Sequence, residues 1–252
     1  MPASSRKRNK GKKRKAKKDE IERAERERLL DIWLGWASGV QKYVGDTVTC
    51  DHGCGAIPDD LDLPILSFLC MISARGFSVG NLINASYTND GGIVLKNGRY
   101  RESVVNILIR MGTNMLVSDS RENDISALTL AKSIATIEQC DDTGSLYFNS
   151  RIVSRKIRDL HTGSRRDALK FYSKRVSCSC LKSMHQEARR TFLKTGKCYH
   201  CKIEKERVAL SVCSRCMITQ YCSRECQVAN WPEHEEDCDI YIGRERGYIE
   251  EV

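Results

Sequence analysis

The sequence predicts a mainly α-helical protein with a disordered basic arm at its N-terminus and a small cysteine-rich finger near its C-terminus. Apolar residues recur at three-to-four-residue spacing through much of the chain, which is typical of helices. Ten Lys and Arg residues and no acid lie within residues 1–18, and four closely spaced Cys or His pairs lie within residues 198–238. We therefore expect a disordered basic tail (1–18), a mainly helical region of unknown type (19–197), the finger (198–238) and a C-terminal tail (239–252).

Composition excludes several classes of protein. With 17 Gly and 4 Pro in 252 residues, the chain is neither collagen-like nor of low complexity. Its longest apolar stretch, roughly residues 63–74, is shorter than the ~20 residues that a bilayer-spanning helix needs, so we expect no membrane helix. The basic N-terminus runs into acidic residues and not into an apolar segment, which argues against a secretory signal. We expect an intracellular protein, with the basic tail favouring the nucleus over the cytoplasm.

The first predicted helices follow the basic arm. Apolar residues on one stripe predict a helix from Asp19 to about Val40, in which Trp33 and Trp36 are packing anchors. The segment from Leu61 to Ala74 is expected to form a buried helix. The full stripe of the first helix is Ile21, Leu29, Ile32, Trp33, Trp36 and Val40.

Helical spacing returns after a loop-rich stretch. Asn97-Gly98, between Ile93-Val94-Leu95 and Arg99-Tyr100, predicts a hairpin turn and is the only β signal before the finger. Later periodic segments predict further helices, of which the last ends at Gly196 with a left-handed cap. Cys70 and Cys140 lie in apolar helical stretches and are expected to be buried thiols.

The cysteine pairs of the finger carry the strongest signal in the chain. Closely spaced pairs let two side chains of one turn reach the same tetrahedral ion, and eight N/S ligands complete two structural zinc sites that leave no position for a water molecule. So short a segment cannot bury enough apolar surface to fold alone, so its folding should require the metal. The eight candidate ligands are Cys198, Cys201, Cys213, Cys216, Cys222, Cys226, His234 and Cys238.

The charge of this segment indicates the kind of partner. Seven thiolates and two zinc ions change the formal charge of residues 198–238 from −2 to −5. An acidic surface repels a phosphate backbone, so a protein ligand fits the finger better than a nucleic acid does. Residues 151–197, with 14 Lys and Arg against 3 acids, leave a nucleic-acid role open elsewhere in the chain.

The same residues resemble the MYND-type zinc finger, whose pattern of CxxC, CxxC, Tyr-Cys with CxxxC and HxxxC is met without a gap over residues 198–238. The resemblance implies interleaved sites, with the first and third pairs on one zinc and the second and fourth on the other. Spacing alone leaves a sequential pairing equally open. It also implies protein interaction, as an adaptor or regulator, through short proline-containing peptides held in a groove that includes Gln227 and Trp231. His200, between two ligands, is expected to be a surface side chain because eight ligands already saturate two ions.

A third zinc site is a further hypothesis. Cys50, His52 and Cys54 form one close group and Cys178 and Cys180 another, and together they could complete a tetrahedral site. The alternative is that these cysteines are ordinary thiols or, less in keeping with their spacing, iron–sulfur ligands.

Motifs typical of enzymes are missing from the sequence. It contains no dinucleotide fingerprint, P-loop, nucleophile elbow or HExxH motif, and it lacks the Asn-His-Ser-Cys run by which SET-type methyltransferases bind their cofactor. We therefore expect no enzyme. The alternatives are a nucleic-acid-associated factor that uses residues 1–18 and 151–197 and, with less support, a divergent SET-type methyltransferase.

Overall fold

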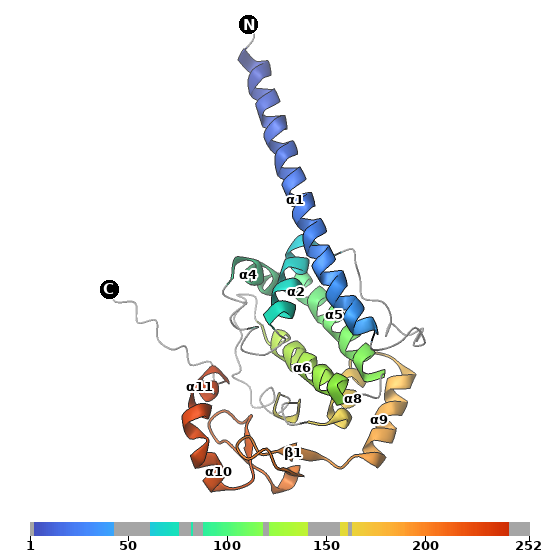
Figure 1. Cartoon of the computed structure of the whole chain (residues 1–252), viewed down its shortest axis with the longest axis vertical. Coiled ribbons are helices and arrows are strands. Elements are labelled where there is room, and N and C mark those ends of the chain that lie inside the picture. Colours follow the sequence, from blue (N-terminus) through green and yellow to red (C-terminus); the bar gives the residue numbers. More distant parts are fainter. Residues whose placement is uncertain are drawn as a thin grey trace, which may run out of the picture.

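The structure is a computed structural model that describes residues 3–42, 61–75, 82, 88–117, 121–140, 157–160 and 163–241. It confirms the mainly α class: a helical body is followed by a small finger at the opposite end of the molecule from the N-terminus (Figure 1). The body contains α1 (Ala3–Lys42), α2 (Leu63–Arg75), α4 (Asn89–Lys96), α5 (Gly98–Val117), α6 (Arg121–Ile137), α8 (Arg165–Ser173) and α9 (Ser179–Thr191). The finger contains β1 (Thr195–Lys197), β2 (Glu204–Glu206), a 3-10 turn (Arg207–Ala209), β3 (Ser211–Val212), β4 (Gln220–Tyr221), α10 (Arg224–Ala229) and α11 (Trp231–Tyr241).

Helix α1 differs from the expectation of a disordered arm, because its backbone is helical from Ala3 onward. Lys, Arg and Ala are good helix formers, and no Pro interrupts them. The arm nevertheless makes no packing contact over the residues whose side chains are described, since every side chain from 12 to 25 is exposed, and it projects away from the body (Figure 1).

The C-terminal half of α1 packs on the body. Trp33 is fully buried, as predicted, and Leu29 is 7% exposed, but Ile21 and Ile32 of the same predicted stripe are exposed. The thiol of Cys70 on α2 donates to the carbonyl of Leu29 at 3.3 Å, which ties the two helices together. The side chains of Trp36 and Val40 lie outside the described residues.

Helices α5 and α6 form the centre of the body, and α8 crosses them through a close contact. The Tyr172 hydroxyl donates to the carbonyl of Ala127 at 2.9 Å, which the ring reaches by passing over Gly112. A Cβ at position 112 would lie 1.9 Å from the Tyr172 Oη, so only glycine allows this approach. Among the described residues, no helix is both long enough and apolar enough to cross a membrane.

The hairpin predicted at Asn97-Gly98 is wrong, because these residues join two helices. The Asn97 Oδ1 accepts hydrogen bonds from the backbone N–H groups of Arg99 at 3.0 Å and Tyr100 at 3.3 Å. Asparagine is favoured at helix N-caps as well as in turns, and here it ends α4 and begins α5. The helix predicted over Leu61–Ala74 is confirmed as α2.

The end predicted for the last body helix at Gly196 is also wrong. Helix α9 ends at Thr191, where the Phe192 N–H still bonds the Ala188 carbonyl. Gly196 lies instead in β1, opposite Lys205 of β2, so the first strand of the finger begins three residues before Cys198. The predicted burial of Cys70 and Cys140 is confirmed.

Candidate metal centre

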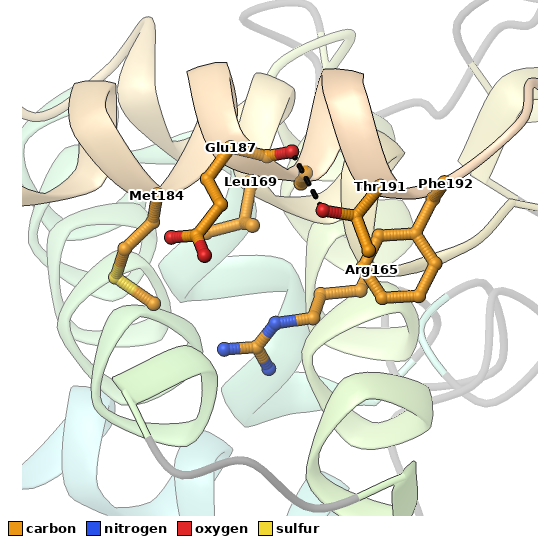
Figure 2. A pocket seen from close by; sticks show the side chains of 7 residues that line it. Arg165, Leu169, Met184, Glu187, Thr191 and Phe192 are labelled. Atoms are coloured by element: carbon orange, nitrogen blue, oxygen red, sulfur yellow. Dashed lines mark hydrogen bonds between the residues drawn. The ribbon is translucent and has the colours of Figure 1, made fainter.

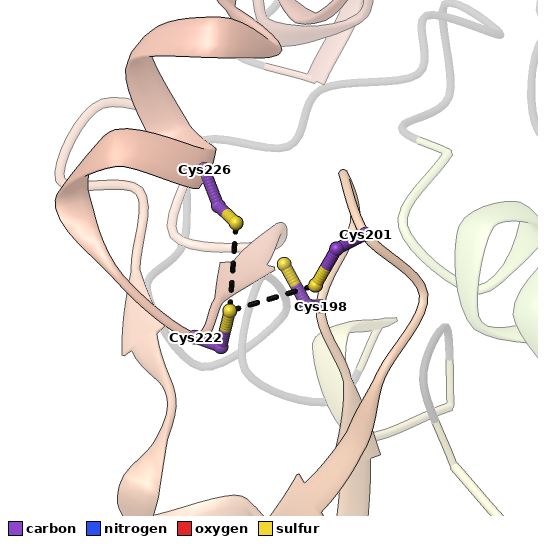
Figure 3. Close-up of side chains that lie close together, drawn as sticks. All are labelled: Cys198, Cys201, Cys222 and Cys226. Carbon is purple, nitrogen blue, oxygen red and sulfur yellow. Dashed lines mark hydrogen bonds between the residues drawn. The ribbon is translucent and has the colours of Figure 1, made fainter.

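The eight predicted ligands lie in two clusters of four. Cys198, Cys201, Cys222 and Cys226 form the first cluster, whose sulfur atoms converge between the β1–β2 connection and α10 (Figure 3). Cys213, Cys216, His234 and Cys238 form the second. This grouping is the interleaved one that the MYND resemblance implied, and it excludes the sequential pairing that spacing alone left open.

Both CxxC turns are built in the same way. The residue after the second cysteine has a positive φ, 60° at Lys202 and 61° at Met217. In each case its N–H bonds the carbonyl of the first cysteine, Cys198 at 3.0 Å and Cys213 at 2.9 Å. The left-handed residue turns the chain back sharply, so that both thiols of a pair face the same point.

The geometry of the clusters fits zinc. A tetrahedral site with Zn–S bonds of about 2.3 Å separates its sulfur atoms by about 3.8 Å. Cys222 Sγ lies 3.5 Å from both Cys201 Sγ and Cys226 Sγ, and Cys216 Sγ lies 3.7 Å from the Nε2 of His234. The clusters are therefore compatible with two zinc ions. Their donor sets, four cysteines in the first cluster and three cysteines with one histidine in the second, are those of structural sites.

The two clusters differ in exposure. In the second cluster all four ligands are buried. In the first, Cys201 is exposed and Cys222 and Cys226 are partly exposed, while Cys198 is buried. Solvent therefore has direct access to the first cluster but not to the second.

Aromatic rings hold the histidine ligand in place. The His234 imidazole makes edge contacts with the rings of Tyr199, Tyr221 and Trp231, whose centroids lie 5.9, 6.0 and 5.8 Å away. Its Nδ1 is buried and has no hydrogen-bond partner in the part of the chain that the structure describes, whereas its Nε2 lies 3.0 Å from the Thr219 Oγ1 and 3.7 Å from the Cys216 Sγ. One ring nitrogen of His234 lies within 4.8 Å of the three sulfur atoms of the cluster, which places it where a histidine ligand would be.

One thiol of the second cluster, that of Cys213, favours the anionic state, whereas burial and its neighbours raise the pKa of Cys238. The hydrogen bond from the Cys216 thiol, followed by that from His234, lowers the pKa of Cys213 to about 3 despite burial. Donating that bond, together with burial, raises the pKa of Cys216. The lowered pKa favours the thiolate form of Cys213, which is the form that binds a metal ion.

The two residues predicted to line a peptide groove lie on neighbouring helices. Gln227 is on α10, Trp231 begins α11, and both are half-buried. The guanidinium of Arg215 lies 5.8 Å from the Trp231 ring centroid and forms an ion pair with Asp239. Trp231 thus has one edge against a zinc ligand and a cation near its ring.

Among the described residues, no other residue considered as a metal ligand in the sequence joins either cluster. His200 is exposed and belongs to neither cluster, as expected. A disulfide joins Cys178 and Cys180 at the start of α9, so in this structure neither sulfur is free to bind a metal ion. Cys50, His52 and Cys54 lie outside the described residues.

Sequence reasoning missed the contact that joins the finger to the body. Arg207, in the turn after β2, is 8% exposed and donates from Nη2 to the Asp167 carboxylate of α8 at 2.7 Å. The same nitrogen donates to the carbonyl of Thr195 at 2.9 Å, and Nη1 lies 3.3 Å from the Asp159 carboxylate. Forty residues separate Arg207 from Asp167, and no local pattern marks either as a partner of the other.

Comparisons with known proteins agree with this geometry. No curated protein and no solved structure gives a significant match to the chain. The family model of the MYND finger matches residues 198–238, the segment that supplies both clusters. Residues 198–238 are therefore a MYND finger, and fingers of this family are generally modules of protein–protein interaction.

Proposed function

We propose that the finger recruits another protein by binding a short proline-containing segment of it, and that the chain acts as an adaptor or regulator. The observation that carries the proposal is Trp231, a half-buried indole fixed against His234, with the half-buried Gln227 four residues before it on the neighbouring helix α10. A rigid indole offers a flat apolar surface to a proline ring, and a Gln amide can bond to an extended backbone.

The experiment is a quantitative pull-down from cell extract with the intact chain and with Trp231→Ala. Ile203→Ala is the matched control, because it removes a 53% exposed apolar side chain from the same finger without touching the ligands. Zinc content must be equal in all three proteins. Loss of specific partners with Trp231→Ala alone supports the proposal, and identical partners in all three contradict it.

The partners recovered then define the peptide. Short synthetic peptides are made to cover the sequence of each partner. Every peptide that contains proline is compared with a variant in which alanine replaces the proline. We expect the proline peptides to bind the intact chain and the alanine variants to bind at least tenfold more weakly. Equal binding by both would show that the groove does not recognise proline.

We also propose that the protein is not an enzyme. Each cluster has four protein donors, which fill a tetrahedral zinc ion and leave no position at which it could activate water. Titration calorimetry with S-adenosylmethionine, the cofactor of the SET-type alternative, should show no binding. A saturable heat signal would reopen the methyltransferase hypothesis.

We propose a third zinc ion that is bound by Cys178 and Cys180 together with residues of the Cys50-His52-Cys54 group. The support is the ligand types in the sequence, and zinc binding requires reduction of the disulfide that joins Cys178 and Cys180, because only free thiolates bind the metal. Native mass spectrometry should find three zinc ions in the intact chain and two in a Cys178→Ser/Cys180→Ser variant. Two ions in both proteins would show that these thiols bind no metal.

Nuclear localisation is proposed from the basic N-terminal part of α1. Its Lys and Arg side chains from residue 12 onward are exposed, so an import receptor could reach them. A fluorescent fusion of the intact chain should concentrate in the nucleus, whereas one with Gln at the basic positions of residues 6–18 should not. The same distribution for both would contradict this assignment.

A further inference from the structure

Helices α8 and α9 bring together basic residues that are separate in the sequence. Arg166 and Lys170 lie on α8, and Lys182, His185 and Arg189 lie on α9; we call these five the α8/α9 basic surface. The positions 182, 185 and 189 follow one stripe of α9. The proximity of the two helices is reflected at His185, whose pKa is lowered by burial and then by the charges of Arg189, Lys170 and Arg166.

These cations lack the partners that other Arg residues of the region have. Arg165 pairs with Asp124 at 2.6 Å, Arg175 with Glu138 at 2.5 Å and Arg207 with Asp167 at 2.7 Å. None of the four permanent cations of the basic surface forms an ion pair with any residue that the structure describes, and Lys170, Lys182 and Arg189 are exposed. Clustered like charges without counter-charges favour the binding of an anion.

The acids nearby do not neutralise this surface. Asp167 is buried and holds Arg207 of the finger. Glu187 lies on a different face of α9, about 200° around the helix from His185. Figure 2 shows Glu187 with Met184 and Thr191 above the Leu169 and Arg165 side chains of α8.

A hollow lies between α8 and α9 on the face of α9 that carries Glu187, and Glu187 and Arg165 are among the residues that line it (Figure 2). It has a volume of about 280 Å³, and its walls include the apolar side chains of Leu169, Met184 and Phe192 (Figure 2). Phe192 is 42% exposed, and its backbone carbonyl accepts a hydrogen bond from Arg166 at 3.1 Å, so one cation of the basic surface contacts the residue that carries this exposed ring.

We propose that this end of the helical body binds single-stranded nucleic acid, with phosphates on the α8/α9 basic surface and a base against Phe192 at the hollow. Cations beside an exposed aromatic ring are the combination by which proteins hold unpaired strands. Further exposed basic residues lie on α1, in a separate part of the molecule. A long polyanion could contact both basic regions, whereas a short acidic peptide could not, so a nucleic acid fits better. The proposal does not depend on the peptide groove of the finger.

The test measures binding of a labelled mixed-sequence single-stranded RNA to the full-length zinc-loaded protein over a range of salt concentrations. The test variant is Lys170→Gln/Lys182→Gln/Arg189→Gln. The matched control is Lys96→Gln/Lys205→Gln/Arg224→Gln, which removes the same net charge from exposed cations elsewhere. Zinc content and helical circular dichroism must be unchanged in both variants.

The expected result is a smaller salt dependence in the test variant only. Each lost phosphate contact lowers the slope of log affinity against log salt by about 0.7 on a single strand, so the slope should fall by roughly two. Phe192→Ala should weaken single-strand binding about tenfold and leave duplex binding almost unchanged. Equal slopes for the test and control variants would overturn the proposal, as would competition by polyglutamate equal to that by RNA of the same charge.

Discussion

Arg207 of the finger and Asp167 of α8 form a buried ion pair in which both side chains are no more than 7% exposed. The Asp167 carboxylate also accepts the backbone N–H of Ser164 at 3.2 Å, so the same group ends the turn before α8 and anchors the finger. The finger is therefore attached to the body by a desolvated charge pair, and each part affects the stability of the other.

Arg207→Met should destabilise the zinc-loaded protein by about 3 kcal/mol, because it leaves a buried carboxylate without its cation. Asp167→Asn should cost a similar amount, and the double variant less than the sum of the two, since the pair is already broken. Denaturant unfolding of the four proteins measures this coupling. The half-exposed pair of Arg215 and Asp239 is the control, and its coupling should be below about 1 kcal/mol. Additive effects for Arg207 and Asp167 would show that the pair contributes nothing.

Gly112→Ala should destabilise the body by about 2 kcal/mol or more, although alanine is the better helix former. Its Cβ would overlap the Tyr172 ring and displace the hydroxyl from the Ala127 carbonyl. Gly35→Ala is the matched control, because a Cβ there meets nothing within 4 Å and should stabilise α1 by up to about 1 kcal/mol. Thermal unfolding measures whether each variant is more or less stable than the intact chain. A Gly112→Ala protein that is more stable would disprove the close contact.

A chelator should remove zinc from the finger in two steps, because the first cluster is open to solvent and the second is buried. The faster step should disappear in Cys201→Ser, which disables the exposed cluster, and remain in Cys216→Ser. A colorimetric zinc indicator follows the release, and mass spectrometry counts the ions that remain. A single rate for both ions would contradict the difference in access.

The imidazole of His185 should titrate below the ordinary pKa of 6.5, because burial and neighbouring cations disfavour its charged form. The unfolded chain then binds the proton more readily, so this group reduces stability as the pH falls through 6.5 and has no effect well above it. Arg189→Gln should raise the pKa of His185, whereas Arg190→Gln, whose charge is not among the causes of the shift, should change it less. Histidine NMR signals followed over a pH series give the values directly, and a pKa above 6.5 in the intact chain would refute the predicted environment.

The sequence was most informative where chemistry restricts spacing. The ligand pairs of the finger and the buried helix at Leu63–Arg75 were predictable because coordination and helical periodicity each leave a pattern a few residues long. Asn97 was assigned to a hairpin turn because asparagine is common both in turns and at helix caps. Only the packing of the neighbouring segments determines which of the two structures forms. The Arg207–Asp167 pair could not be predicted, since it depends on how distant segments meet. The basic excess of residues 151–197 was evident in the sequence, but which of these side chains share the α8/α9 basic surface was not.

The interleaving of the two clusters imposes an order on biosynthesis. Cys198 and Cys201 share their metal site with Cys222 and Cys226, which are synthesised later. Neither zinc site is therefore complete while the ribosome is still adding the intervening residues. Arg207 lies within that unfinished span, so the nascent α8 carries an unpaired Asp167 until the finger closes around its metal. The helical body therefore reaches its full stability only when the finger has been translated and loaded, and zinc supply during translation should set the yield of the whole protein.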